Sequence, residues 1–197
     1  MIPVNKLLNL LAQNKSLNEI SEILSCKTNE IKSILLKIAD SYHDPKSESV
    51  SDGKLEKDGK VLVFSDGASR GNPGPSSIAC VILNSKKQEI THANKYIGKA
   101  TNNEAEYMAI LLALDRLDEM QGVKSVDFFT DSQLVARQIN GEYKVSNNRI
   151  LEFVQLFMDR IKKYPVFSIT HIPRGENKYA DMLANMALDE HIKSFKF

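Results

Sequence analysis

The sequence contains no tryptophan, only two cysteines and almost no net charge. Its 197 residues include 26 lysines and arginines against 25 aspartates and glutamates, which gives a formal charge of +1. A chain with this balance lacks an overall basic character, so any binding to nucleic acid has to depend on a local site. No apolar run approaches the roughly 18 residues of a membrane span, so we expect no transmembrane helix and no membrane partner.

The cysteines and the N-terminal residues argue against a secreted, disulfide-bonded protein. Cys26 and Cys80 lie far apart in segments predicted to belong to different elements. We therefore expect two reduced, buried thiols in a cytosolic protein. The opening residues MIPVNKLLNLLAQNKSL have neither a basic region nor a small-residue cleavage site, so we do not expect a signal peptide. The expected localisation is cytoplasmic.

A polar segment at 41–59 divides the chain into two predicted parts. It contains Pro45, Gly53 and Gly59 and shows no periodicity, which is typical of a linker. Before it, the spacing of leucines and isoleucines predicts three short amphipathic helices, which are Val4–Asn14, Leu17–Leu24 and Thr28–Asp40. Each helix alone would be marginally stable, so we expect them to share the core of a small all-α module over residues 1–40.

The larger part, residues 60–197, alternates between element types. Strand-like runs at 60–66, 77–84 and 88–97 are followed by a helix at 102–120. The remaining predicted elements are a strand at 124–130, helices at 132–140 and 147–163, a strand at 165–171 and a helix at 176–192. Three strands in succession and then strand–helix alternation predict an α/β domain with a mixed sheet and helices packed on it.

Two carboxylates follow predicted strands. Asp66 ends the run VLVFSD, and Asp131 ends VDFFTD immediately before a helix. Sites in open α/β sheets form beyond the carboxyl ends of strands, so these two side chains are expected to lie close together. Each also has a more ordinary interpretation: Asp66 as a turn aspartate that bonds the following amides, and Asp131 as a helix N-cap.

Two further carboxylates border buried helix faces. Thr101 and Glu104 form a capping-box pattern, and from Glu106 the apolar residues recur at helical spacing. Asp181 borders a similar stripe near the C-terminus. Clustered buried carboxylates without basic partners are most simply explained by a divalent cation, and a set of oxygen ligands suits magnesium or manganese.

The segment after Asp66 combines three glycines with two prolines. We expect Gly67, Gly71 and Gly74 to let the backbone approach a polymeric substrate closely. The prolines at 73 and 75 would stiffen the turn. Taken alone, this segment is fully explained as an ordinary hairpin loop.

Four segments together resemble a known family. In order, DGASRGNPGP, TNNEAEY, TDSQLV and HIPRGENKYADMLAN resemble the four motifs of type I ribonuclease H, over about residues 60–192. The resemblance implies the ribonuclease H fold, a five-stranded mixed sheet flanked by helices. It implies hydrolysis of the RNA strand of RNA–DNA hybrids with two magnesium or manganese ions, which leaves 5′-phosphate and 3′-hydroxyl ends. The implied catalytic and metal-binding acids are Asp66, Glu106, Asp131 and Asp181.

The same resemblance implies a set of substrate contacts. Members of the family read ribose 2′-hydroxyls and backbone shape, which is a general way to distinguish RNA from DNA. By position, the contacts to the sugar-phosphate backbones would come from Ser69, Asn72, Asn102, Asn103 and Gln133. Without the family pattern, Asn102 and Asn103 are equally well explained as residues at a helix start.

A histidine and an arginine are candidates for proton transfer or product release. His171 ends the run FSITH, ten residues before Asp181, where family members carry a histidine in the catalytic loop. The loop HIPRGEN departs from the family pattern, and Arg174 is an alternative charged helper. The ordinary interpretation of His171 is a polar residue at the end of a strand.

Two other features depart from some family members. The segment INGEYKVSNNR joins two helices directly, without an inserted basic helix, and the N-terminal part lacks the character of a hybrid-binding domain. Instead, SLNEISEILSCKTNEIKSILLKI resembles a helix-turn-helix. Residues 1–40 carry a charge of only +1, which is weak for a phosphate binder. This module is therefore either a DNA- or hybrid-binding element or one that docks on a protein or on itself.

Two rival functions remain open at this stage. One is another nucleic-acid enzyme of the wider superfamily, against which TNNEAEY and GNPGP argue. The other is a non-catalytic nucleic-acid-binding protein directed by its N-terminal module. The presence of all four acids argues against it, because an unused cluster of carboxylates would only lower stability.

Overall fold

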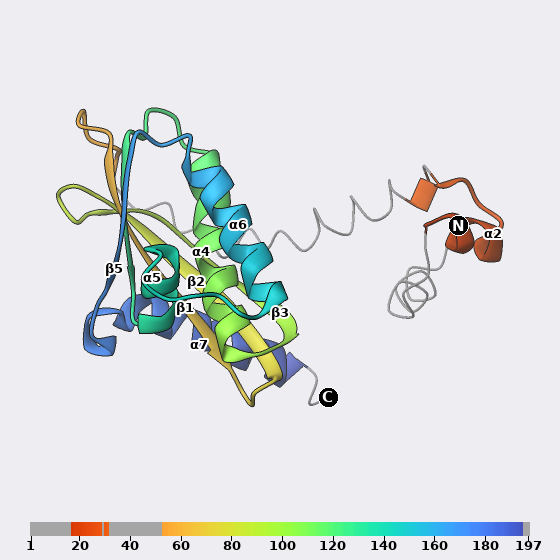
Figure 1. Cartoon of the computed structure of the whole chain (residues 1–197). Coiled ribbons are helices and arrows are strands. Elements are labelled where there is room, and N and C mark those ends of the chain that lie inside the picture. Colours follow the sequence, from red (N-terminus) through yellow and green to blue (C-terminus); the bar gives the residue numbers. More distant parts are fainter. Residues whose placement is uncertain (1–16, 29, 32–52, 195–197) are drawn as a thin grey trace. The chain divides into compact units, whose positions relative to one another are not determined.

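The computed structural model describes residues 17–28, 30–31 and 53–194 (Figure 1). The chain divides into two compact units, Met1–Lys46 and Ser47–Phe197. In the first unit, α2 spans Leu17–Leu24, as the sequence predicts. The predicted helices Val4–Asn14 and, for the most part, Thr28–Asp40 lie outside the described residues. Cys26 is only partly buried, so the expectation of two buried thiols holds for Cys80 alone.

The second unit is built on a five-stranded sheet in the order β3-β2-β1-β4-β5. The strands are β1 (Lys60–Ser69), β2 (Gly74–Asn84), β3 (Glu89–Ala100), β4 (Ser125–Thr130) and β5 (Val166–His171). β2 pairs antiparallel with β1 and β3, whereas β4 pairs parallel with β1 and β5. The sheet is therefore mixed, as the succession of elements predicts.

Helices cover both faces of the sheet. They are α4 (Asn102–Asp118), α5 (Gln133–Ile139), α6 (Asn148–Ile161) and α7 (Lys178–Ser194), with a 3-10 turn, η1 (Arg174–Glu176), before α7. α4, α5 and α6 bury one face, around Val63, Ile82 and Phe128. α7 packs on the other face, against Ala79 and Val81 of β2. Alternate residues of β2 thus enter the two cores, as the two-residue repeat of a strand requires.

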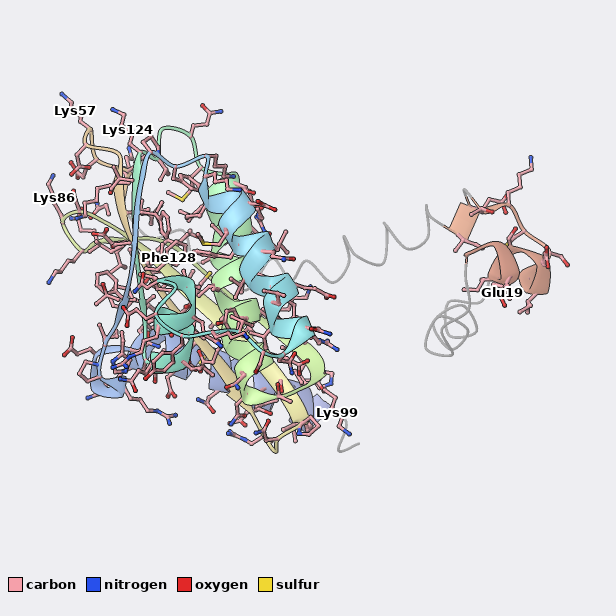
Figure 2. All side chains as sticks on the ribbon, in the orientation of Figure 1. Glu19, Lys57, Lys86, Lys99, Lys124 and Phe128 are labelled. Atoms are coloured by element: carbon pink, nitrogen blue, oxygen red, sulfur yellow. The ribbon has the colours of Figure 1, made fainter. Side chains whose placement is uncertain are left out.

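Labelled lysines lie at both ends of the domain (Figure 2). Phe128 lies between the sheet and the helices, while Lys57, Lys86 and Lys124 lie at one end of the sheet and Lys99 at the other. Lys99 pairs with Pro75 beside the end of β1, where the predicted acids are. The labelled lysines at the far end are therefore not part of that site.

The C-terminal part of the predicted linker packs on the sheet. Gly53 donates a backbone hydrogen bond to Glu89 O (3.1 Å), and Asn84 Nδ2 donates to Lys54 O (3.0 Å). Leu55 contacts the main core. Since these contacts come from residues before β1, the sheet-bearing unit extends N-terminal to residue 60. Among the helices of the described part of the chain, none is long and apolar enough to cross a membrane.

Candidate active site

Asp66 lies inside β1, where the neighbouring strand β4 ends. β1 pairs with β4 only as far as Phe64 opposite Phe129, although it continues along β2 to Ser69. Asp66 is paired with Ala79 of β2 and is 5% exposed. The prediction that Asp66 closes its strand is therefore wrong by three residues, and the turn interpretation is wrong as well. The parting of β1 from β4 creates the opening that this carboxylate faces.

Glu106 is brought to Asp66 by the start of α4. The capping box is confirmed: Glu104 N donates to Thr101 Oγ1 (3.2 Å) and Thr101 N donates to Glu104 Oε2 (2.8 Å). The stripe that follows Glu106 is fully buried, as predicted; its members are Ala109, Ile110, Ala113, Leu114 and Leu117. These contacts fix the helix on the sheet and turn Glu106 toward β1.

Gly67 sets how closely α4 approaches β1. A Cβ atom at this position would lie 2.4 Å from the carbonyl carbon of Ala105 and 2.5 Å from the backbone nitrogen of Glu106. Only glycine permits this contact between backbones. A Cβ atom at Gly74 would likewise lie 2.4 Å from the carbonyl oxygen of Arg70. The expectation that these two glycines make room for a substrate is therefore wrong, because the space they leave is filled by the protein itself.

Asp131 follows β4 directly, and it is not the helix cap. The N-cap of α5 is Ser132, whose side chain accepts from Val135 N. Asp131 Oδ1 instead accepts from Asn177 Nδ2 (3.3 Å). The same amide group donates to Ser65 O (2.9 Å), the carbonyl next to Asp66. Asn177 therefore bridges β1 and the end of β4 at the point where their ladder stops.

The structure brings three of the four predicted acids into one cluster. Oxygen atoms of Asp66, Glu106 and Asp131 all lie within 4.8 Å of one another. Burial, followed by repulsion from Asp131 and Asp181, raises the pKa of Asp66 from 3.8 to about 7. Burial and the charges of Asp66 and Asp131 raise the pKa of Glu106 well above its ordinary value. Packing acids this tightly destabilises their charged forms unless a cation is bound.

The donor set fits a hard divalent cation. It consists entirely of carboxylate oxygens, which suit magnesium or manganese and not zinc. Glu106 Oε2 is buried without a hydrogen-bond partner within the described part of the chain. A buried carboxylate oxygen left unpaired is costly, and coordination to a cation would satisfy it. The cluster thus has the composition and the unmet bonding capacity of a metal site.

Asp181 lies at the edge of this cluster. It sits in the first turn of α7, its backbone N–H donates to Asn177 O (3.1 Å), and its side chain is 28% exposed. The stripe predicted beside it is present, with Ala184 and Leu188 fully buried. Asp181 Oδ1 accepts from Arg174 Nη2 at 2.6 Å. The fourth acid is therefore close enough to act on Asp66 but is paired with an arginine.

The predicted substrate contacts surround this end of the sheet. Asn102 and Asn103 are exposed at the start of α4, and Gln133 is exposed at the start of α5. Asn72 Oδ1 accepts from Asn102 N (3.2 Å), and Ser69 Oγ donates to Gly71 O (2.5 Å). The loop after β1 is thus joined to the N-terminus of α4 beside the acids.

His171 ends β5 and is exposed. It pairs across the sheet with Thr130, the residue before Asp131. This register places His171 on the strand next to the one that delivers Asp131. The structure confirms that His171 is a strand-end residue, and its role in the site stays a prediction.

Sequence reasoning missed Asn177. It is 1% exposed, contacts two parts of the site and anchors the first turn of α7. Its Oδ1 atom and Ser65 Oγ have no partner within the described residues. The available signal was a polar residue one helical turn before Asp181, in a segment that follows a strand. A short polar residue there is also common at helix starts, so the pattern alone is not specific.

Comparison with known proteins agrees with this architecture. A family model described as Reverse transcriptase-like matches residues 64–187. Ribonuclease HI of Halobacterium salinarum is 36% identical over 135 residues, 68% of this chain and 67% of that protein. Ribonuclease H of Methylococcus capsulatus is 31% identical over 156 residues, 72% of this chain and 97% of that protein. The bifunctional protein Rv2228c of Mycobacterium tuberculosis is 34% identical over 136 residues, and this chain spans only 37% of its length.

Solved structures give the same result. RNase H1 from Halobacterium salinarum superposes with a TM-score of 0.64 at 36% identity and covers 66% of this chain and 98% of that one. LC11-RNase H1, solved in complex with an RNA/DNA hybrid, gives 0.63 at 35% identity and covers 67% of this chain and 99% of that one. The matched region begins in β1, ends in α7 and contains all four acids. The chain therefore belongs to the ribonuclease H-like family and is an enzyme of the ribonuclease H kind.

Proposed function

We propose that the chain hydrolyses the RNA strand of RNA–DNA hybrids and leaves 5′-phosphate and 3′-hydroxyl ends, as type I ribonucleases H do. The observation that carries this proposal is the set of three carboxylates within 4.8 Å, at the point where β1 and β4 part. The complex of LC11-RNase H1 with an RNA/DNA hybrid, at 35% identity, supports the hybrid as the substrate class.

Two magnesium or manganese ions are the proposed cofactors. Bound ions would activate the attacking water and stabilise the departing 3′ oxygen. By analogy with the family, Asp66 would contribute to holding both ions. Asp131 would hold the ion on the side of the water, and Glu106 and Asp181 the ion on the side of the leaving group. Asn177 orients Asp131 by donating to its Oδ1 atom.

The neutral side chains at this end of the sheet are proposed to position the substrate. Hydroxyl and amide groups both donate and accept, so they suit ribose hydroxyls and backbone oxygens without requiring a basic protein. The proposed contacts are Ser69, Asn72, Asn102, Asn103 and Gln133. Their placement on two helix N-termini and the loop after β1 supports this role, because these segments border the acids.

His171 is proposed to move a proton to or from the departing product. Its strand lies beside β4, which ends just before Asp131, and an imidazole can both donate and accept a proton. Arg174 is the alternative helper, since it already contacts Asp181.

The N-terminal module, residues 1–40, is proposed to bind DNA, the hybrid or a protein partner. The proposed linker to the nuclease lies before Gly53, because Gly53, Lys54 and Leu55 already pack on the sheet-bearing unit. The proposed location of the protein is the cytoplasm, in keeping with its two free cysteines.

The test is a cleavage assay on an end-labelled hybrid. We expect cleavage in magnesium or manganese and none in excess chelator. Product RNA should carry a 5′-phosphate, detectable because it can be ligated without prior phosphorylation. Asp131→Asn should reduce cleavage to near background while the circular dichroism spectrum stays unchanged. Asp127→Asn is the matched control and should cleave normally, because Asp127 lies in β4, four residues before Asp131, and pairs with Lys60 at 2.7 Å.

A further inference from the structure

Asp181 differs from the other three acids in its surroundings. Asp66, Glu106 and Asp131 form the 4.8 Å cluster, and Asp181 is not a member of it. Its Oδ1 atom instead receives a hydrogen bond of 2.6 Å from Arg174, seven residues earlier in the chain. The guanidinium that makes this bond is 77% exposed, and the carboxylate is 28% exposed. The pair therefore lies at the mouth of the site, where solvent and cations have access.

The charge of Arg174 acts on the whole cluster. It lowers the pKa of both Asp66 and Glu106, against the larger effect of burial. A single guanidinium thus partly neutralises acids on β1 and on α4 while it is bonded to α7. This is the electrostatic role that a bound cation would take over.

We propose that Arg174 is a built-in counterion of the metal-free site, which occupies Asp181 and has to release it before that carboxylate can hold a cation. The inference rests on the proposed function, because it assumes that the cluster binds divalent ions. As a consequence, a higher cation concentration is needed to fill the part of the site that includes Asp181 than to fill the three-carboxylate cluster. Asp66 and its two neighbours have no such competitor among the ion pairs of the described residues.

The size of the effect follows from the exposure of the pair. Exposed ion pairs contribute little, because both partners are well solvated when they separate. Removing the guanidinium also leaves the cluster more negative, which strengthens its attraction for cations. We therefore expect Arg174→Gln to tighten the weaker cation-binding step by about two- to fivefold. Arg174→Lys keeps the charge but loses the planar fork, so it should lie between Arg174→Gln and the unaltered protein.

The experiment is a calorimetric titration of the full chain with Mn²⁺ after the metal has been stripped with chelator. Arg149→Gln is the matched control, since Arg149 is an exposed arginine in an ion pair of 2.7 Å with Glu104, an acid outside the cluster. A second readout is the melting temperature as a function of Mn²⁺ concentration, which reports binding without any cleavage. Tighter binding in Arg174→Gln, with Arg149→Gln equal to the unaltered protein, is the expected result.

Three results would overturn the inference. Equal or weaker Mn²⁺ binding by Arg174→Gln would show that the arginine does not compete. An equal gain in Arg149→Gln would show a general effect of net charge. If the unaltered protein and Asp66→Asn bind Mn²⁺ with the same affinity, the carboxylate cluster is not a metal site. That result would contradict both the inference and the proposed function. The first two results leave the proposed function intact, so the two failures are distinguishable.

Discussion

Replacing Asp66 by asparagine should make the metal-free protein more stable at neutral and alkaline pH. Asp66 is 5% exposed, and its pKa rises from 3.8 to about 7 through burial and the nearby charges of Asp131 and Asp181. The folded protein therefore holds this proton up to a higher pH than the unfolded chain does. Asparagine has nearly the same shape and carries no charge at any pH, so it avoids the penalty of ionising a buried group.

The sign and size of this change in the free energy of unfolding follow from proton linkage. The stability associated with the retained proton is fully present below pH 3.8 and is lost as the pH rises through about 7. A difference of about 3 pKa units corresponds to about 4 kcal/mol, as an upper value for the gain of Asp66→Asn above pH 7. Near pH 4 the two proteins should be equally stable, because the aspartate is then protonated in the folded state. Saturating magnesium should reverse the order, because only the aspartate is a strong ligand.

The assay is urea unfolding in chelator at a series of pH values, followed by circular dichroism. Asp127→Asn is the control: it removes a carboxylate that pairs with Lys60 and accepts from Ser168 (2.8 Å), so it should lower stability slightly. If Asp66→Asn is no more stable than the unaltered protein at about pH 8, or if its advantage persists at about pH 4, the electrostatic account of the site is wrong.

Four further changes test separate parts of the structure. Gly67→Ala should cost about 2 kcal/mol or more in urea unfolding, because its Cβ would meet the α4 backbone, whereas Gly175→Ala, with nothing within 4 Å, should be nearly neutral. Asn177→Ala should lower stability by about 1–3 kcal/mol and reduce hybrid cleavage, because Ser65 O and the oxygen of Asp131 lose their donor. His171→Ala should slow turnover by up to about 100-fold yet leave measurable cleavage; complete loss would make the histidine indispensable, and no change would favour Arg174 or a structural role. A chain beginning at Ser47 should fold and cleave the hybrid. If residues 1–40 bind nucleic acid, this truncation should raise KM more than it lowers kcat, and the rise in KM should be smaller at high salt. Equal KM values for the full and the truncated chain at low salt would exclude nucleic-acid binding by residues 1–40.

Local patterns were sufficient to predict most of the nuclease unit. Helix periodicity identified the buried face of α4, and the Thr101–Glu104 capping box located its first turn. Both signals lie within a few residues of each other, so no tertiary information was needed. Strand ends were less accurate: β1 and β3 each run three residues beyond their predicted ends, because both strands continue to pair with β2 there.

Features that depend on distant residues could not be predicted in this way. Asn177 contacts Ser65 across 112 positions of sequence, and nothing in either local segment indicates the other. The role of Gly67 depends on the approach of α4, a separate element. The motifs predicted Asp181 as an acid equal to the rest, whereas the structure pairs it with Arg174. Local sequence patterns identify the acids, whereas the contacts that hold each acid are seen only in the folded structure.

The most direct test of the central claim is cleavage of three duplexes of one sequence: an RNA–DNA hybrid, double-stranded RNA and double-stranded DNA. Each would be incubated with the full chain and with Asp66→Asn, in magnesium, in manganese and in chelator. We predict that the unaltered chain cuts only the RNA strand of the hybrid, only with a divalent ion, and that Asp66→Asn cuts none of the three. A folded chain that leaves the hybrid intact in both metals, or an Asp66→Asn protein that cuts it at the normal rate, would contradict the assignment.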